Sequence, residues 1–428
     1  MRASYDTLPY ESHAISATHI EVLAVEAMVA GLSPTPVDRC RVLELGCASG
    51  GNLLPMAEQF PGSEFVGIDL SPIQIAEGQR LAEQVGLRNV KLLAMDVMQA
   101  GAELGQFDFI IAHGLYSWVP PAVQRKVLEI ISAHLASSGA AYISYDTFPG
   151  WHPRLMLREM LQRHTRSAGQ QADAVSRACH FLEALVTTDA RDSGPNAGIL
   201  TDDARKLLQM GDSYIAHEPL TDYLEAIYFE EFVSRLESRG LTYLAECRPR
   251  LSRMALARVV VRHFPELAGD WVGREQYVDF FLGSQFRRSA IAHAAATPQR
   301  EHDPSLIERL MMRALCKPAT DTIDLSPGAV VVFDGGATGK AGLTDPASKA
   351  IVVAICRRWP ELVSLDEALA DARAQLRTPD NFASPGTAAR QEICRALMNC
   401  RDGGLIELRA RKADFTTRVS ERPVASPL

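Results

Sequence analysis

The feature that most constrains the fold is the regular alternation of short apolar runs and amphipathic segments between residues 41 and 147. Apolar runs bounded by turn residues predict strands, and apolar residues at helical spacing predict helices. The predicted strands are residues 41–46, 63–70, 90–96, 107–113 and 140–147. The predicted helices are residues 52–60, 71–85 and 121–135. Because this order favours a mostly parallel sheet covered on both faces, we expect a doubly wound α/β protein.

The remainder of the chain departs from this alternation. Residues 150–239 have a mostly helical pattern, residues 241–247 predict a strand, and residues 286–294 predict a late strand that completes the sheet. The pattern weakens at residues 301–327, which predicts a domain boundary. Beyond it, three helices and a strand indicate a winged-helix-like α+β module. These elements are residues 348–359, 364–376, 387–400 and 405–410.

Composition excludes several functional classes. The 428 residues carry a net charge of −8, which argues against general binding to nucleic acid. No signal peptide and no membrane-spanning apolar stretch is recognisable, so we expect a cytoplasmic protein with no membrane partner. The eight cysteines form no CxxC pair, which predicts reduced thiols and no metal site. For Arg390, Arg395 and Arg401 we expect protein contact or a homodimer rather than DNA binding.

The first predicted strand runs into a glycine-rich loop, LELGCASGGN at residues 43–52. A dinucleotide-binding loop has the pattern G-x-G-x-x-G, and here its middle glycine is replaced by Ala48. The loop fits better the acidic-x-G-x-x-x-G pattern of S-adenosylmethionine (SAM) methyltransferases, with Glu44, Gly46 and Gly50. Such a loop folds around an amino-acid tail and a sulfonium instead of a pyrophosphate.

Two acidic residues at the ends of the next strands support this interpretation. Asp69 ends the second strand, where a carboxylate can bind both ribose hydroxyls, and Asp96 ends the third, where it can accept from an adenine amino group. Each acid alone is equally well explained as a helix N-cap. A glycine loop and two acids at three consecutive strand ends together predict SAM binding.

Several longer stretches resemble one family. They are YDTLPYESHAISATH (5–19), LELGCASGGNLLPMA (43–57), GIDLSPIQI (67–75), FDFIIAHGLYSWVP (107–120), YISYDTFPGWHPR (142–154) and QYVDFFLGSQFRRSAIAHA (276–294). In these stretches the chain resembles class I SAM methyltransferases with a methyltransferase regulatory domain, a group that includes rickettsial outer-membrane-protein lysine methyltransferases. Asp146 and Phe148 depart from the family, in which we expect Asn and Tyr.

The resemblance implies an organisation in three parts. Residues 1–217 are expected to form a Rossmann-like SAM-binding catalytic domain with a helical insertion, and residues 218–300 a regulatory segment that completes the catalytic fold. Residues 301–428 are expected to form the winged-helix-like domain. An N-terminal segment with Tyr5, Tyr10 and Ser12 is expected to close over the cofactor. The remaining predicted cofactor residues are Glu44, Gly46, Cys47, Ala48, Gly50, Asn52, Asp69, Leu70, Gln74, Asp96, Val97, His113 and Gly114.

The methyl acceptor is expected at the ends of the fourth and fifth strands, between aromatic walls that suit a lysine side chain or a methylammonium. Tyr116, Asp146 and His113 are the candidate catalytic groups. The candidate substrate contacts are Ser117, Trp118, Tyr145, Phe148, Trp151 and His152. For both tryptophans, interdomain packing is the alternative.

The sequence therefore predicts a SAM-dependent methyltransferase that releases S-adenosylhomocysteine. An amine is the first expectation for the acceptor, in particular a protein lysine. A small-molecule N- or O-methyltransferase and a non-catalytic SAM-binding regulator are the alternatives.

Overall fold

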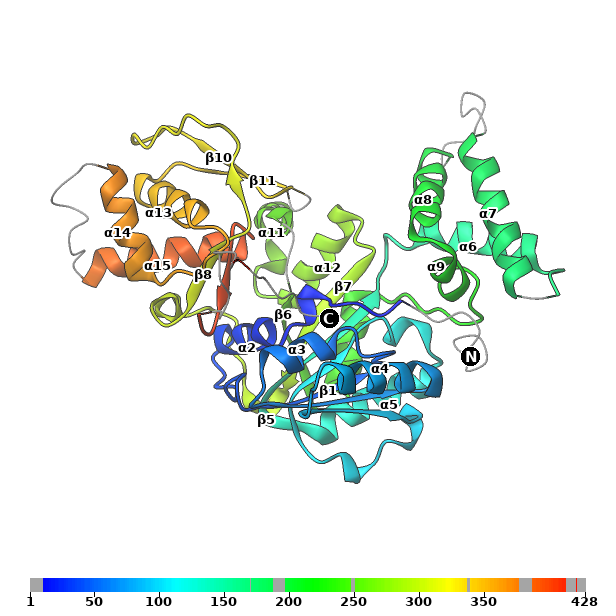
Figure 1. Ribbon diagram of the computed structural model, residues 1–428. Helices are drawn as coiled ribbons and strands as arrows, with labels where there is room; N and C mark the ends of the chain where they lie inside the picture. The colour runs from blue at the N-terminus through cyan, green and yellow to red at the C-terminus, as the bar shows by residue number, and fades with distance from the viewer. Residues whose placement is uncertain are drawn as a thin grey trace.

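The computed structural model of this protein describes residues 11–169, 171–187, 197–247, 251–336, 339–376, 387–412 and 421 (Figure 1). A seven-stranded sheet lies at its centre, in the order β3-β2-β1-β4-β5-β7-β6. All neighbouring strands are parallel except at β7, which runs antiparallel to both β5 and β6. The strands are β1 (Arg41–Leu45), β2 (Glu64–Asp69), β3 (Val90–Ala94), β4 (Phe107–Ala112), β5 (Leu135–Asp146), β6 (Leu241–Glu246) and β7 (Phe286–His293).

Helices cover both faces of this sheet, as the alternating pattern predicts. One face packs against α2 (Ile20–Val29), α3 (Leu53–Gln59) and α4 (Pro72–Gln84). The other face packs against α5 (Pro121–His134) and α10 (Phe229–Glu237). Successive residues of a strand point to opposite faces, so Val42 belongs to the first core and Leu43 to the second. The doubly wound α/β fold is confirmed.

Strand β5 begins earlier than its apolar pattern indicates. The structure extends it to Leu135, directly after α5, whereas the pattern predicts a start at residue 140. Leu135 pairs with Phe107 before a register irregularity between Phe107 and Phe109. The intervening Ser137 and Ser138 are polar, so periodicity does not reveal this part of the strand.

Four helices between β5 and β6 form a separate unit with its own apolar core, which includes Leu157, Leu161 and Leu182. They are α6 (His152–Thr165), α7 (Gln171–Thr187), α8 (Ala197–Met210) and α9 (Asp212–His217). In Figure 1 these green helices stand to one side of the sheet, away from the C-terminal part of the chain. We call this unit the helical insertion. Two further helices, α11 (Leu251–His263) and α12 (Trp271–Leu282), lie between β6 and β7 in the sequence.

The C-terminal part contains the three predicted helices, α13 (Pro346–Arg357), α14 (Leu365–Leu376) and α15 (Thr387–Asp402). Its strands are β8 (Met311–Ala314), β9 (Lys317–Pro318), β10 (Val331–Asp334), β11 (Lys340–Leu343) and β12 (Ile406–Arg409). Strand β12 pairs with β8, and β9, β10 and β11 form a second small sheet. The winged-helix-like description of this part stays a prediction. No helix in the described ranges has both the length and the apolar character that crossing a membrane requires.

Helix α2 is shared between the sheet domain and the C-terminal part. Its Val25 and Val29 belong to the apolar core of α13, α14 and α15. Arg401 forms a close ion pair with Glu26 of α2, and Arg390 pairs with Glu308 at 2.8 Å. These two arginines therefore make contacts within the chain, and the protein contact or homodimer expected from the sequence stays a prediction.

Candidate active site

The glycine-rich loop leaves β1 and enters α3 with a backbone that depends on its small residues. Gly46, Ala48 and Gly50 have φ values of 75°, 49° and 79°, in the left-handed region that glycine adopts most readily. The amides of Gly46 and Cys47 both donate to the carbonyl oxygen of Ile68 on β2. The loop is thus fixed to the neighbouring strand and leaves its inner edge open to the space above the sheet.

Glu44 lies buried at the base of the loop. Its Oε1 accepts a hydrogen bond from Asn52 Nδ2 at 2.8 Å, while Oε2 is buried and has no hydrogen-bond partner in the described residues. Burial raises the pKa of Glu44 to about 7, and the nearby carboxylate of Asp69 adds to the increase. Glu44 therefore retains unused hydrogen-bonding capacity beside the loop.

The N-terminal segment is tied to the same loop by three hydrogen bonds. Asn52 Oδ1 accepts from the Ile15 amide at 3.0 Å and from Thr18 Oγ1 at 3.0 Å. The Gly51 amide donates to Ser12 Oγ at 2.8 Å. Ser12 therefore lies against the loop, where the sequence analysis predicts a covering segment. Tyr5 and Tyr10 lie outside the described residues.

Asp69 and Asp96 lie at the carboxyl ends of β2 and β3. Asp69 Oδ2 accepts from the Ala48 amide and Oδ1 from the Ser71 amide, both at 2.9 Å. Asp96 Oδ1 accepts from the Met98 amide at 2.9 Å and caps a short 3-10 helix. A carboxylate has about four acceptor positions, so these contacts fix both groups and still leave capacity for a ligand.

A cavity of about 1060 Å³ opens above this edge of the sheet. This volume lies just above the usual range of small-molecule sites, about 300–1,000 Å³. Among the described members of the predicted cofactor set, all but Gly50 line it. These residues are Ser12, Glu44, Gly46, Cys47, Ala48, Asn52, Asp69, Leu70, Gln74, Asp96, Val97, His113 and Gly114.

The residues that line this cavity match the chemical groups of SAM. Carboxylates at the loop and at two strand ends match its ammonium, ribose hydroxyls and adenine amino group, and the buried free oxygen of Glu44 is the most specific of these features. When bound, SAM supplies a methyl group on a sulfonium that is already activated for transfer.

Asp146, Trp118 and Trp151 also line this cavity. The rings of Trp118 and Trp151 meet edge-to-face with centroids 5.9 Å apart. Asp146 Oδ2 is buried and lacks a hydrogen-bond partner within the described residues. Burial, reinforced by the Glu218 carboxylate, raises the pKa of Asp146 well above its usual value. The site therefore combines aromatic walls with a carboxyl group that readily holds a proton.

Five other predicted acceptor-site residues do not line the cavity. The rings of Tyr116 and Tyr145 both pack against Phe232 of α10, at 5.9 and 4.1 Å between centroids. Tyr145 faces away because its strand neighbours Ser144 and Asp146 occupy the opposite face. The catalytic role expected of Tyr116 and the substrate contact expected of Tyr145 do not fit this placement.

The other three residues support the site from outside. Ser117 Oγ accepts from the Asp146 amide at 2.8 Å and so fixes the strand end that carries the carboxyl group. Phe148 stacks on His152 at 4.4 Å between ring centroids. Neither of these two rings is part of the cavity wall.

His113 is a neutral histidine inside the cavity. Its Nδ1 lies 3.1 Å from the hydroxyl oxygen of Tyr142. Burial, together with the positive charge of Arg288, lowers the pKa of His113 to about 4. At neutral pH its ring is therefore available as a hydrogen-bonding group without charge.

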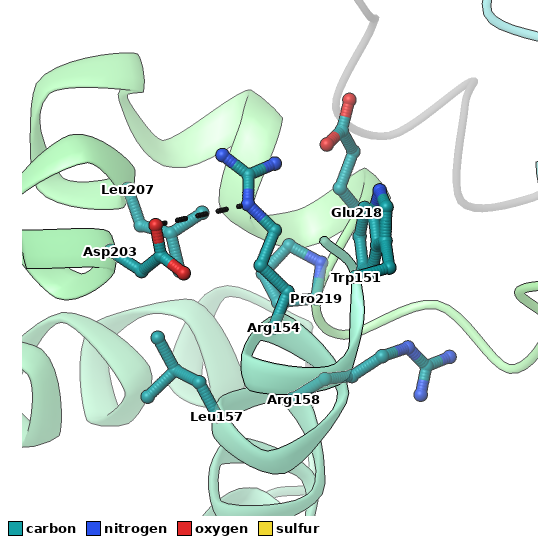
Figure 2. Close-up of a pocket in the computed structure, with 8 residues that line it drawn as sticks. All are labelled: Trp151, Arg154, Leu157, Arg158, Asp203, Leu207, Glu218 and Pro219. Carbon is teal, nitrogen blue, oxygen red and sulfur yellow. Dashed lines mark ion pairs between the residues drawn. The ribbon is translucent and has the colours of Figure 1, made fainter. Parts of the chain in front are cut away.

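The sequence does not predict several residues that line the cavity, because they come from distant segments. The helical insertion contributes Lys206, Met210, Tyr214 and His217, and the chain just after it contributes Glu218. Figure 2 shows Arg154 between Asp203 and Glu218 at a small adjoining cavity of about 20 Å³. Strand β7 contributes Phe286 and Arg288. No local motif marks these positions, since only the folded chain brings them to the strand ends.

Comparison with known proteins agrees with this geometry. The Methyltransferase domain model matches residues 42–139, and the Predicted methyltransferase regulatory domain model matches residues 211–293. An uncharacterised protein of Rickettsia prowazekii is 30% identical over 379 residues, 87% of this chain and 68% of the relative. A second protein of that organism is 33% identical over 243 residues, 57% of this chain and 97% of the relative.

The structure is also similar to that of PKMT2 from Rickettsia typhi in complex with AdoHcy. The TM-score is 0.82 with 26% identity, and the match covers 98% of this chain and 80% of that one. The glycine loop, the two strand-end acids and the cavity above them are thus found in a chain with methyltransferase relatives. The protein belongs to the SAM-dependent methyltransferases that carry a methyltransferase regulatory domain.

Proposed function

We propose that this methyltransferase acts on an amine, and that the acceptor is the side chain of a protein lysine. The observation that carries the proposal is the buried carboxyl group of Asp146 in a cavity that Trp118 and Trp151 also line. Aromatic faces attract a cationic ammonium and its alkyl stem, and they exclude water from the site. The similarity to PKMT2 and the size of the cavity support a long acceptor side chain.

In this mechanism Asp146 prepares the acceptor. A lysine enters as an ammonium, which has no lone pair for attack. The ionised Asp146 takes one proton from it, and the raised pKa of the carboxyl group favours this transfer. The neutral nitrogen could then accept the methyl group that bound SAM would supply, with S-adenosylhomocysteine as the other product.

The chain fixes this arrangement through backbone contacts. The Asp146 amide donates to Ser117 Oγ, and its carbonyl oxygen accepts from the Ile227 amide at 3.1 Å. Such anchoring matters because methyl transfer requires the attacking nitrogen, carbon and sulfur to align.

The test is the replacement Asp146→Asn, which keeps the shape of the side chain and removes its basicity. We expect transfer of tritiated methyl groups to protein to fall by about 100-fold or more, the usual contribution of a general base. Binding of S-adenosylhomocysteine should change little. Asp173→Asn, in an exposed ion pair of α7, is the matched control and should retain full transfer.

The location of the label distinguishes the acceptor classes. Wild-type enzyme incubated with tritiated SAM and cell lysate should place the label in macromolecules, on lysine after hydrolysis. Label found only in the small-molecule fraction would refute the lysine proposal and favour a metabolite acceptor.

A further inference from the structure

Two consecutive arginines of β7 have opposite surroundings. Arg287 is fully buried and points away from the cavity into a cluster of acids. It lies 2.8 Å from Asp279, 3.2 Å from Glu275 and 3.5 Å from Glu246. Its charge is therefore matched within the protein. Because side chains alternate along a strand, Arg288 points to the other face.

Arg288 faces the cavity and is only partly buried. Its position is fixed by the strand, since its amide donates to Glu246 Oε1 at 2.7 Å and its carbonyl oxygen accepts from the Cys247 amide at 2.7 Å. In register it lies opposite Ser144 of β5, whose Oγ accepts from the Gly114 amide at 2.9 Å. Arg288 thus adjoins the end of β4, where its charge acts on His113, and it lines the same cavity as the glycine loop.

The other long cations of the cavity already have acidic partners. Lys206 lies 3.3 Å from Asp203, and Arg154 lies 4.0 Å from the same carboxylate. Arg253 pairs with Glu275 at 2.5 Å and with Asp279 at 3.0 Å. For Arg288, the described part of the chain provides no ion pair, and its guanidinium lies 5.2 Å from the ring centroid of Phe286.

A cation at this point requires an explanation, because the sulfonium, the ammonium and the expected acceptor are all positive. The methionine tail of SAM has a single anionic group, its α-carboxylate. Arginine matches a carboxylate with two parallel hydrogen bonds. We propose that Arg288 binds the α-carboxylate of SAM, while Glu44 faces the ammonium of the same tail.

The test compares two ligands that differ only in this carboxylate. S-Adenosylhomocysteine and its decarboxylated analogue, 5′-deoxy-5′-(3-aminopropylthio)adenosine, are titrated by calorimetry. Wild-type protein should prefer the carboxylate form by about 10- to 100-fold, the value of a charge-assisted hydrogen-bonding pair. Equal affinity of the wild-type protein for both ligands would overturn the proposal without any variant.

In Arg288→Gln this preference should disappear, because only S-adenosylhomocysteine loses affinity. Arg288→Lys should restore part of it. Lys206→Gln, a paired cation of the same cavity, should retain the wild-type ratio. An equal loss for both ligands in Arg288→Gln, or unchanged affinity for S-adenosylhomocysteine, would refute the proposal. Because no acceptor is present, the outcome is independent of the proposed lysine specificity.

Discussion

Glu44 and Asp146 are two buried carboxyl groups that line one cavity, and each keeps one oxygen without a partner in the described residues. Burial raises both pKa values, so each group keeps its proton to a higher pH than an exposed carboxyl group does. In the proposed mechanism Glu44 binds the cofactor and Asp146 acts on the acceptor. Their titration should therefore affect different steps, cofactor binding for Glu44 and methyl transfer for Asp146.

The pKa of about 7 at Glu44 predicts a pH-dependent cofactor affinity. As pH rises from 6 to 8, Glu44 ionises and attracts the ammonium of the methionine tail more strongly. The affinity for S-adenosylhomocysteine should increase by up to about tenfold per unit below the pKa and level off above it. Calorimetry at several pH values measures this. Glu44→Gln should bind more weakly and show no such rise, and a parallel rise in the variant would contradict the assignment.

For individual residues, the sequence predicts well those that belong to a local motif. Glu44, Gly46, Asp69 and Asp96 follow from strand ends and a loop, and the structure places all four at the cavity. Arg288 and Glu218 do not follow, because they lie more than 60 residues along the chain from the acceptor residues and only folding brings them to the same cavity. Tyr145 shows the opposite error, since a strand-end aromatic can face either side and the pattern cannot choose.

Among the elements, helix α4 contacts the glycine loop closely. A Cβ atom at Gly78 would lie 2.4 Å from the Ser49 carbonyl oxygen and 2.6 Å from Leu92. Both atoms belong to well-packed parts of the structure, so the loop or the helix would have to move. The absence of a side chain at Gly78 therefore lets α4 approach the loop.

Gly78→Ala should destabilise the protein by about 1–3 kcal/mol through overpacking, despite the better helix propensity of alanine. It should also weaken binding of S-adenosylhomocysteine, because the displaced atom belongs to the loop. Gly198→Ala in α8 is the control, since its Cβ would meet nothing within 4 Å. Denaturant unfolding and calorimetry measure both effects. Unchanged cofactor affinity in Gly78→Ala would show that the helix moves instead.

The sequence predicts whether a strand exists more reliably than it predicts where the strand begins and ends. Strands β1 to β4 and the late strand β7 are confirmed because each is a distinct apolar run between turn residues. The first residues of β5 escape the pattern because Ser137 and Ser138 are polar and lie where the register with β4 is irregular, between the paired residues Leu135 and Ala140.

For the whole molecule, α2 couples the catalytic fold to the C-terminal part. Thr18, just before α2, donates a hydrogen bond to Asn52. On α2 itself, Glu26 pairs with Arg401 and Glu21 pairs with Arg409. A continuous set of contacts therefore leads from the C-terminal core to the glycine loop. The sequence pattern predicts the tail helices but not this connection, which joins residues nearly 400 positions apart.

Arg401→Ala should destabilise the molecule strongly. It leaves Glu26 buried without its cation, and removal of one partner of a buried pair costs about 3–5 kcal/mol. Differential scanning calorimetry should show a lower melting temperature, and the double replacement Glu26→Gln with Arg401→Met should recover most of the loss.

Arg390→Ala removes a more exposed pair and provides the comparison. Its cost should stay within about 1 kcal/mol, the usual range of surface ion pairs. Equal losses for the two arginine variants would mean that the contact with α2 is no more important than a surface pair.

The opposite surroundings of Arg287 and Arg288 have a consequence for insertions and deletions. A one-residue slip of β7 between β5 and β6 would turn every side chain of the strand to the other face. Arg287 would then enter the cavity, and Arg288 would meet the acids Asp279 and Glu275. The insertion or deletion of one residue in the connection Gly283–Gln285 would thus leave the sequence of β7 unchanged and still turn its side chains to the opposite faces of the sheet. The length of that short connection deserves as much protection in protein engineering as the glycine loop itself.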